Sequence, residues 1–153
     1  MENLRLVWTD GNDPDFRRFY ADTEQFYNEI AGGAEKRQAF IPHNLSGSIP
    51  DAVIAYAGDN AAGCCGLRPY SEDAVEIKRL WVDPACRGRG IAGRIMEAVE
   101  ARARKLGFER AILQTRPSMK AAVALYTRRG YRQIPNYPPY DKLEGAVCMG
   151  KLL

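Results

Sequence analysis

The stretch that decides the fold is Glu76–Gly107, EIKRLWVDPACRGRGIAGRIMEAVEARARKLG. Its first part belongs to a run of β-branched and large apolar residues that predicts a strand over 74–82, and Asp83-Pro84 ends it. Apolar residues at spacings of three and four then predict a helix over 91–106, which Gly107 ends. A strand, a glycine-arginine turn and a helix therefore follow one another.

The turn carries Arg87, Gly88, Arg89 and Gly90, two cations on a backbone with few side chains. The unpaired N–H groups and the dipole at a helix N-terminus favour negative charge. Glycine lets a phosphate approach the amides closely. Four such residues alone are also typical of a flexible basic loop, but their place between a strand and a helix predicts a site for a phosphate-bearing ligand.

The same residues spell the dinucleotide-binding pattern G-x-G-x-x-G over Gly88–Gly93. That pattern follows its strand almost directly and opens a long series of strand-helix-strand units. Here five residues separate Val82 from Gly88, and fewer than fifty follow the next strand. Arg116, at the end of that strand, is placed like a residue that binds the 2′-phosphate of NADP. An NADP-binding protein is therefore the less favoured alternative.

The rest of the chain reads as short elements joined by turns. Further strands are predicted over 4–8, 52–57, 61–70, 109–115, 131–134 and 146–152, and further helices over 14–31 and 119–129, the last capped by Ser118. Residues 34–50 predict an irregular connection. Because a helix intervenes, strands 74–82 and 109–115 are expected to run parallel. The fold class is α+β, with a mixed, mainly antiparallel sheet.

Size and charge narrow the class of protein. The 153 residues, 46% of them hydrophobic, predict one domain over 1–153. A net charge of +3 without a polybasic tail suits a polyanionic small molecule better than nucleic acid. No apolar run approaches the length of a membrane helix, and charges throughout residues 1–30 argue against a signal peptide. A cytoplasmic protein without a membrane partner is expected.

Cysteine and histidine usage predicts no metal and no disulfide. The cysteines are Cys64, Cys65, Cys86 and Cys148, none in a C-x-x-C pair, and His43 is the only histidine. Cys64 and Cys65 are expected to be reduced core residues. Cys86 is expected to be an incidental exposed thiol, with a reactive thiol in the anion-binding turn as the alternative.

Two motifs together resemble the GCN5-related N-acetyltransferase (GNAT) family. Arg87–Ala92, RGRGIA, matches the family pattern of Arg or Gln, two residues, Gly, one residue, then Gly or Ala. Leu125–Tyr131, LYTRRGY, matches the helix end Leu-Tyr-x-x-x-Gly-Phe/Tyr. The resemblance covers roughly 51–134 and implies the GNAT fold, with a central sheet of about six to seven strands flanked by helices.

The resemblance implies acetyl-CoA as co-substrate, with its diphosphate on the N–H groups of 87–93 and its pantetheine along strand 74–82. Strands 74–82 and 109–115 are expected to splay apart beyond Leu80–Val82, and the N–H of Val82 to bind the thioester oxygen as an oxyanion hole. The implied cofactor-binding residues are Leu80, Trp81, Val82, Arg87, Gly88, Arg89, Gly90, Ile91, Ala92, Gly93, Met119, Ala122 and Tyr126. Met119 replaces an Asn common in the family, so a side-chain hydrogen bond to pantetheine is in doubt.

The implied activity is N-acetyl transfer to a primary amine, directly in a ternary complex. Tyr126 matches the family's general acid, which protonates the CoA thiolate; the alternative is a packed aromatic. The acceptor ammonium must lose a proton before it attacks. Glu76 matches the position of a basic glutamate in some members; the alternatives are a strand carboxylate paired with Lys78 or Arg79, ordered water, and His43.

The acceptor is expected to be a small-molecule or peptide amine, selected by the helix over 14–31 and the segments 34–50 and 137–140. Asp22, Glu24 or Glu29 are expected to attract a cationic amine. A non-catalytic acyl-CoA-binding regulator is the alternative function, and a nucleic-acid-binding module is disfavoured because no aromatic residues interleave with the turn. Whether the protein forms a homodimer is left open.

Overall fold

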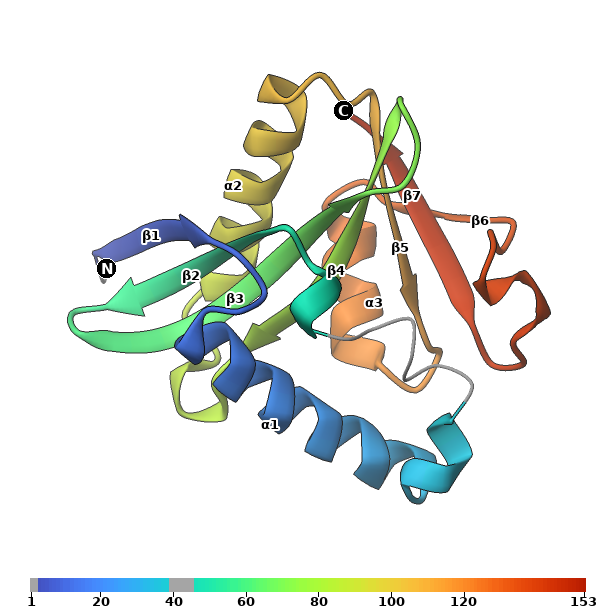
Figure 1. Cartoon of the computed structure of the whole chain (residues 1–153), viewed down its shortest axis with the longest axis horizontal. Helices are drawn as coiled ribbons and strands as arrows, with labels where there is room; N and C mark the ends of the chain where they lie inside the picture. Colours follow the sequence, from blue (N-terminus) through green and yellow to red (C-terminus); the bar gives the residue numbers. More distant parts are fainter. Residues whose placement is uncertain (1–2, 39–45) are drawn as a thin grey trace.

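The computed structural model describes residues 3–38 and 46–153 (Figure 1). His43 and part of the 34–50 connection lie outside the described residues. Seven strands form one sheet in the order β1-β2-β3-β4-β5-β7-β6. They are β1 (Leu4–Thr9), β2 (Asp51–Ala57), β3 (Asn60–Pro69), β4 (Ala74–Val82), β5 (Arg110–Thr115), β6 (Arg132–Ile134) and β7 (Val147–Leu152). Among the described strands, β4 and β5 are the one parallel pair, so the predicted mixed, mainly antiparallel sheet is confirmed.

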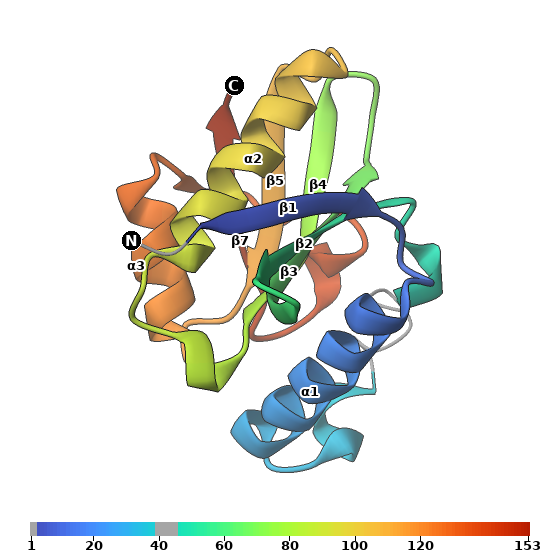
Figure 2. The ribbon, with the colours of Figure 1, turned by 90° about the vertical axis from the view of Figure 1, so that its left-hand side faces the viewer.

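Helices cover both faces of the sheet (Figure 2). The helices are α1 (Pro14–Ala31), α2 (Ile91–Lys105) and α3 (Lys120–Arg128). Side chains alternate across a strand, and on β2 Val53 packs in the cluster that includes α2 and α3, while Ile54 packs in the cluster with Phe16 and Phe19 of α1. The helix α1 therefore lies on the face opposite α2 and α3.

Local sequence sets most helix ends. The Asp13 side chain accepts the N–H of Asp15 at 2.9 Å and caps α1. Gly107, with φ 92°, ends α2, and Phe108 N–H then donates to Ala103 O at 3.0 Å.

The prediction that Ser118 caps α3 is wrong. The cap is Met119, whose side chain makes no capping bond. The Met119 N–H donates to Arg116 O at 3.0 Å, so a tight turn precedes the helix and places Ser118 one residue too early to cap it.

The gap between β4 and β5 opens earlier than expected. Parallel pairing ends at Glu76↔Ile112, not beyond Leu80. Two features explain the difference: β5 pairs along its whole length with β7, and β4 bulges opposite Cys65, where Arg79 has φ 58°. A bulge bends its strand, and here it turns the second half of β4 away from β5.

Candidate active site

A cleft of about 890 Å³ occupies this gap, between the end of β4, the turn before α2, and α3. All the predicted cofactor-binding residues line it except Arg89 and Tyr126. Arg89 is exposed beside the cleft, and Tyr126 lines a neighbouring pocket. The turn and the helix face, far apart in sequence, are thus brought to one cavity.

The turn presents backbone donors to the cleft. Gly88 and Gly90 adopt left-handed conformations, with φ 82° and 76°, and Gly90 is the cap of α2. The first helical bond runs from Arg94 N–H to Gly90 O at 3.2 Å. The N–H groups of residues 91–93 precede that bond and have no partner within the helix. They are suited to bind phosphate oxygens.

Arg87 and Trp81 form the wall beside these donors. Arg87 Nε donates to Val82 O at 3.0 Å, and its guanidinium lies 4.7 Å from the centre of the Trp81 ring. Phe26 of α1 packs 5.4 Å from the same ring. Among the described residues, the buried indole N–H of Trp81 has no hydrogen-bond partner.

The backbone at the end of β4 is turned into the gap. Asp83 N–H donates to Ala62 O of β3 at 2.8 Å. Because consecutive N–H groups of a strand point to opposite sides, that of Val82 points away from β3, toward the side that β5 has left. This orientation is the one that an oxyanion donor needs.

Sequence reasoning missed part of the cleft. The additional lining residues are Phe26, Cys86, Ser118, Lys120, Ala121, Leu125, Arg128 and Arg129. Those on and just before α3 recur at spacings of three and four, so a helical projection around Met119 and Ala122 would have found most of them. Lys120 and Arg128 add positive charge opposite the turn.

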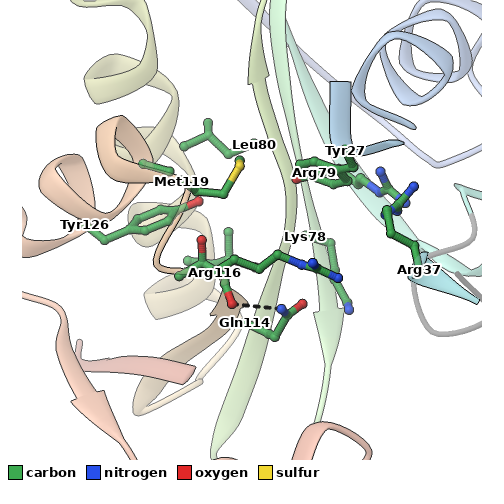
Figure 3. Close-up of a pocket in the computed structure, with 12 residues that line it drawn as sticks. Tyr27, Arg37, Lys78, Arg79, Leu80, Gln114, Arg116, Met119 and Tyr126 are labelled. Atoms are coloured by element: carbon green, nitrogen blue, oxygen red, sulfur yellow. Dashed lines mark hydrogen bonds between the residues drawn. The ribbon is translucent and has the colours of Figure 1, made fainter. Parts of the chain in front are cut away.

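A second, smaller pocket of about 70 Å³ adjoins the cleft (Figure 3). It is lined by Tyr27, Arg37, Ile77, Lys78, Arg79, Leu80, Gln114, Thr115, Arg116, Met119, Ala122 and Tyr126. Leu80, Met119 and Ala122 line both cavities. A group that passes these three residues moves from the cleft into the small pocket.

Tyr126 lines the small pocket, and its position depends on how α3 ends. Gly130, with φ 93°, ends the helix, and Tyr131 N–H then donates to Tyr126 O at 2.9 Å. The two rings meet edge to face at 5.7 Å. Tyr126 is 7% exposed, and burial raises the pKa of its phenol well above 10. Its hydroxyl therefore stays protonated at ordinary pH and faces the pocket (Figure 3).

Glu76 lies outside the lining of both cavities. It is 2% exposed, its carboxylate accepts bonds from Arg68 at 3.0 Å and the Tyr137 hydroxyl at 2.7 Å, and Lys78 Nζ lies 3.5 Å away. Burial lowers the pKa of Lys78 to about 8, against the opposing effect of Glu76. Arg79 instead pairs with Glu24. Lys78 is the described residue of the pocket lining that lies beside the Glu76 carboxylate.

The cysteines are unpaired thiols of two kinds. Cys64, Cys65 and Cys148 are buried, and burial raises the pKa of each thiol. Cys86 is half-buried and lines the cleft. Within residues 3–38 and 46–153, no group of three or more His, Cys, Asp or Glu side chains is placed to hold a metal ion.

We expect iodoacetamide to label Cys86 alone in the native protein and acetyl-CoA to slow that labelling. The other thiols are buried and held protonated, whereas a ligand in the cleft would cover Cys86. Peptide mass spectrometry after timed labelling measures both effects. Equal labelling rates at Cys86 with and without saturating acetyl-CoA would contradict the placement of the ligand.

The sequence matches the model of the Acetyltransferase (GNAT) family over residues 8–131. It is 32% identical over 84 residues to the uncharacterized N-acetyltransferase YjgM of Escherichia coli, a match that covers 54% of this chain and 50% of that protein. The chain thus spans about half the length of this relative.

Solved structures share the fold. A GNAT family acetyltransferase from Elizabethkingia anophelis, with acetyl-CoA bound, has a TM-score of 0.70 and 19% identity, with 100% of both chains covered. The PaiA N-acetyltransferase of Thermoplasma acidophilum, in complex with coenzyme A, has a TM-score of 0.74 and 15% identity, with 99% of both chains covered. This chain belongs to the GNAT family. None of its described helices is both long and apolar enough to span a bilayer.

Proposed function

We propose that the protein is an acetyl-CoA-dependent N-acetyltransferase that moves the acetyl group directly to a primary amine in a ternary complex. The observation that carries this proposal is that the cleft beside the amides of residues 91–93 and the pocket of Tyr126 share Leu80, Met119 and Ala122 as lining residues. The relatives that contain acetyl-CoA or coenzyme A support the choice of co-substrate.

In this proposal, the diphosphate lies on the N–H groups of residues 91–93, with Arg87 and Lys120 nearby. The pantetheine follows the unpaired edge of β4. Met119 supplies only apolar and backbone contact where the family often has an asparagine. Arg89 contributes long-range charge from outside the cleft rather than a contact.

The reaction needs an oxyanion donor, a general acid and a base from the chain. The neutral amine attacks the thioester carbon, the C–N bond forms, and the C–S bond then breaks. Val82 N–H stabilises the oxyanion that forms between these events. Tyr126 gives its proton to the departing thiolate. A free thiol has a pKa of roughly 8.5 and a phenol of about 10. Burial disfavours a thiolate as well as a phenolate, so a thiolate in the same pocket is a stronger base than in water.

The proton lost by the acceptor is proposed to pass to Lys78, with Glu76 acting on Lys78 rather than on the acceptor. Lys78 lines the small pocket, and its lowered pKa leaves part of it neutral near pH 8. Direct proton transfer to Glu76 is not favoured, because Arg68 and Tyr137 occupy its carboxylate.

A non-catalytic acyl-CoA-binding regulator remains the alternative. It would need the 87–93 turn but neither Tyr126 nor a second pocket, and the second pocket beside Tyr126 favours an enzyme. Four statements stay predictions. They are that residues 1–153 form one acyltransferase domain, that the protein is cytoplasmic, that it needs no metal ion, and that a homodimer is possible.

Two measurements test the function. Thermal shift with acetyl-CoA, NADP and an oligonucleotide is expected to show stabilisation by acetyl-CoA alone. Detection of free thiol with a panel of primary amines is then expected to show acceptor-dependent release of CoA. Stabilisation by acetyl-CoA without release for any amine would favour the regulator, and stabilisation by NADP would favour the dinucleotide alternative.

The pH dependence tests the role of Glu76. We expect kcat/KM to rise with pH through about 8, as Lys78 loses its proton. Glu76→Gln removes the negative charge that raises the pKa of Lys78, so the rising limb should move to lower pH. The other groups around Lys78 stay in place: Arg68, Arg79, Arg116, Tyr140 and Cys148.

The control is Glu72→Gln, which removes an exposed carboxylate from the turn before β4 and should leave the limb in place. Initial rates with saturating acetyl-CoA give the profile over roughly two pH units on either side of the Lys78 pKa of about 8. If the rising limb of kcat/KM in Glu76→Gln stays at the same pH, the acceptor's proton passes to water or to another group.

A further inference from the structure

The small pocket beside Tyr126 is strongly basic. Of the twelve described residues that line it, Arg37, Lys78, Arg79 and Arg116 carry positive charge and none is acidic. A cationic acceptor with no anionic group would be repelled by the guanidinium charges of Arg37, Arg79 and Arg116, and by Lys78 where it is protonated. The pocket therefore favours an acceptor that brings its own negative charge.

Two of these cations are fixed in position. Arg37 is 2% exposed, and its Nη1 donates to Glu24 Oε2 at 2.8 Å and to Asn28 Oδ1 at 2.7 Å. Arg79 also pairs with Glu24. Both guanidinium groups lie over the Tyr27 ring, at 5.0 and 5.3 Å from its centre. Buried and held on several sides, they keep their charge at the pocket instead of extending into solvent.

The backbone of β4 directs Arg79 to this place. Arg79 is the one described residue other than glycine with a positive φ, 58°, and it forms the bulge of the strand. That conformation is uncommon for a long side chain, and such conformations cluster at binding and catalytic sites. A bulge re-aims a side chain, and here the result is a buried guanidinium beside the acceptor pocket.

The carboxylate that holds Arg37 and Arg79 lies outside the described lining of the pocket. Glu24 is a single carboxylate shared by Arg37 and Arg79. Arg116, from the end of β5, extends across the pocket toward Lys78 (Figure 3). Burial, and then the charge of Arg37, lower the pKa of Arg116. Guanidinium groups on several sides of the pocket, with no carboxylate among its described lining residues, favour an anion in it.

We propose that the acceptor is a small amino acid or a close analogue, with a carboxylate beside its primary amine, and that Arg37, Arg79 and Arg116 bind the carboxylate. This proposal rests on the proposed function. The pocket of about 70 Å³ has room for about two waters, which suits a compact polar group. Guanidinium groups match planar carboxylates through paired N–H donors.

The same charges assist the reaction. Positive groups close to an ammonium lower its pKa and increase the neutral fraction that attacks the thioester. The acceptor's carboxylate thus binds to the arginines of the pocket. The positive charge of the same arginines favours loss of the proton from the acceptor's ammonium group. The expectation that Asp22, Glu24 or Glu29 attracts a cationic amine is not supported, because Glu24 is bound by Arg37 and Arg79 and no acid lines the described pocket.

The first test compares matched acceptors. CoA release is measured with glycine and alanine, with their amides, and with aminomethylphosphonate. We expect kcat/KM, expressed per neutral amine, to be at least about tenfold higher for each acid than for its amide, the gain typical of one charge-assisted pair. Equal or better use of the amides would overturn the proposal, and preference for the phosphonate would overturn its choice of carboxylate.

The second test uses Arg116→Gln, because Arg116 is only half-buried and its loss should spare the fold. The KM for the amino acid should rise about 10- to 100-fold. The KM for acetyl-CoA should not change, and the amide, which has no carboxylate to lose contact, should lose less in kcat/KM than the acid. Arg110→Gln is the control: it removes an arginine of β5 that pairs with Asp73 outside the pocket. Equal losses for acid and amide would overturn the role of Arg116.

A binding measurement separates this proposal from the proposed function. Calorimetry on the CoA-saturated protein compares N-acetylalanine with N-acetylalaninamide and needs no turnover. Tighter binding of the acid, weakened by Arg116→Gln, is the expected result even if no amine in the panel is acetylated. Equal binding of both compounds would overturn the carboxylate site while leaving acetyl-CoA binding and amine acetylation untouched.

Discussion

Gly90→Leu is expected to lower the affinity for acetyl-CoA by at least about a hundredfold, because a side chain at the turn holds the diphosphate away from the N–H groups of residues 91–93. Each lost charge-assisted hydrogen bond contributes roughly 1.5–3 kcal/mol, and every 1.4 kcal/mol is tenfold in affinity. A Cβ at Gly90 meets nothing within 4 Å, so the cost to the fold is the left-handed φ of 76° alone. That cost is about 1–2 kcal/mol.

Two variants separate backbone strain from ligand binding. Gly58→Leu places the same side chain at a φ of 63°, also with nothing within 4 Å, in the β2–β3 turn away from the cleft. It should lose similar stability and keep its affinity. Gly93→Ala lies in α2 with open space around it, so it should raise the free energy of unfolding by about 0.5–1 kcal/mol and still weaken binding. Calorimetry and urea unfolding measure both quantities; unchanged Kd in Gly90→Leu and Gly93→Ala would remove the diphosphate from this turn.

The elements that local chemistry specifies were predictable from the sequence. Helix α2 was expected over 91–106 and spans Ile91–Lys105, because its apolar spacing and the glycines before and after it are all local signals. The separation of β4 from β5 was predicted beyond Leu80, but parallel pairing already ends at Glu76. It depends on a bulge at Arg79, and an arginine in a left-handed conformation has no sequence signal comparable to that of glycine.

The two cavities were not equally predictable. The cleft is built largely from contiguous motifs, so most of its residues were found from the family patterns. The small pocket depends on side chains from α1, η1 (Ala34–Arg37), β4 and β5, such as Tyr27 and Arg116. Glu24 and Arg79 pair across 55 positions of sequence. Periodicity reports which face a residue occupies but not its distant partner, so the basic character of the pocket became evident only in the folded chain.

Tyr126→Phe is expected to lower kcat by on the order of a hundred- to ten-thousandfold, the usual contribution of a positioned general acid. The substitution removes one hydroxyl and keeps the ring that packs 5.7 Å from Tyr131. The Kd for acetyl-CoA and the free energy of unfolding should therefore change little. Single-turnover measurements, in which acetyl transfer is followed after rapid mixing, report the chemical step rather than product release.

Tyr131→Phe is the matched control, because the two tyrosines share one edge-to-face contact but the Tyr126 hydroxyl faces the small pocket and the Tyr131 hydroxyl is bound to Glu100. The Tyr131 hydroxyl donates to Glu100 at 2.9 Å, in a buried network with Arg129 and Lys151. Its loss should cost stability, by about 1.5–3 kcal/mol for a bond to a charged group, and leave the chemical step intact. The opposite pattern is expected for Tyr126→Phe: acetyl transfer should become slow, and the free energy of unfolding should stay unchanged. If Tyr126→Phe instead transfers acetyl at the parent rate in a single turnover, its hydroxyl has no part in catalysis and the ring serves only to pack α3 against Tyr131.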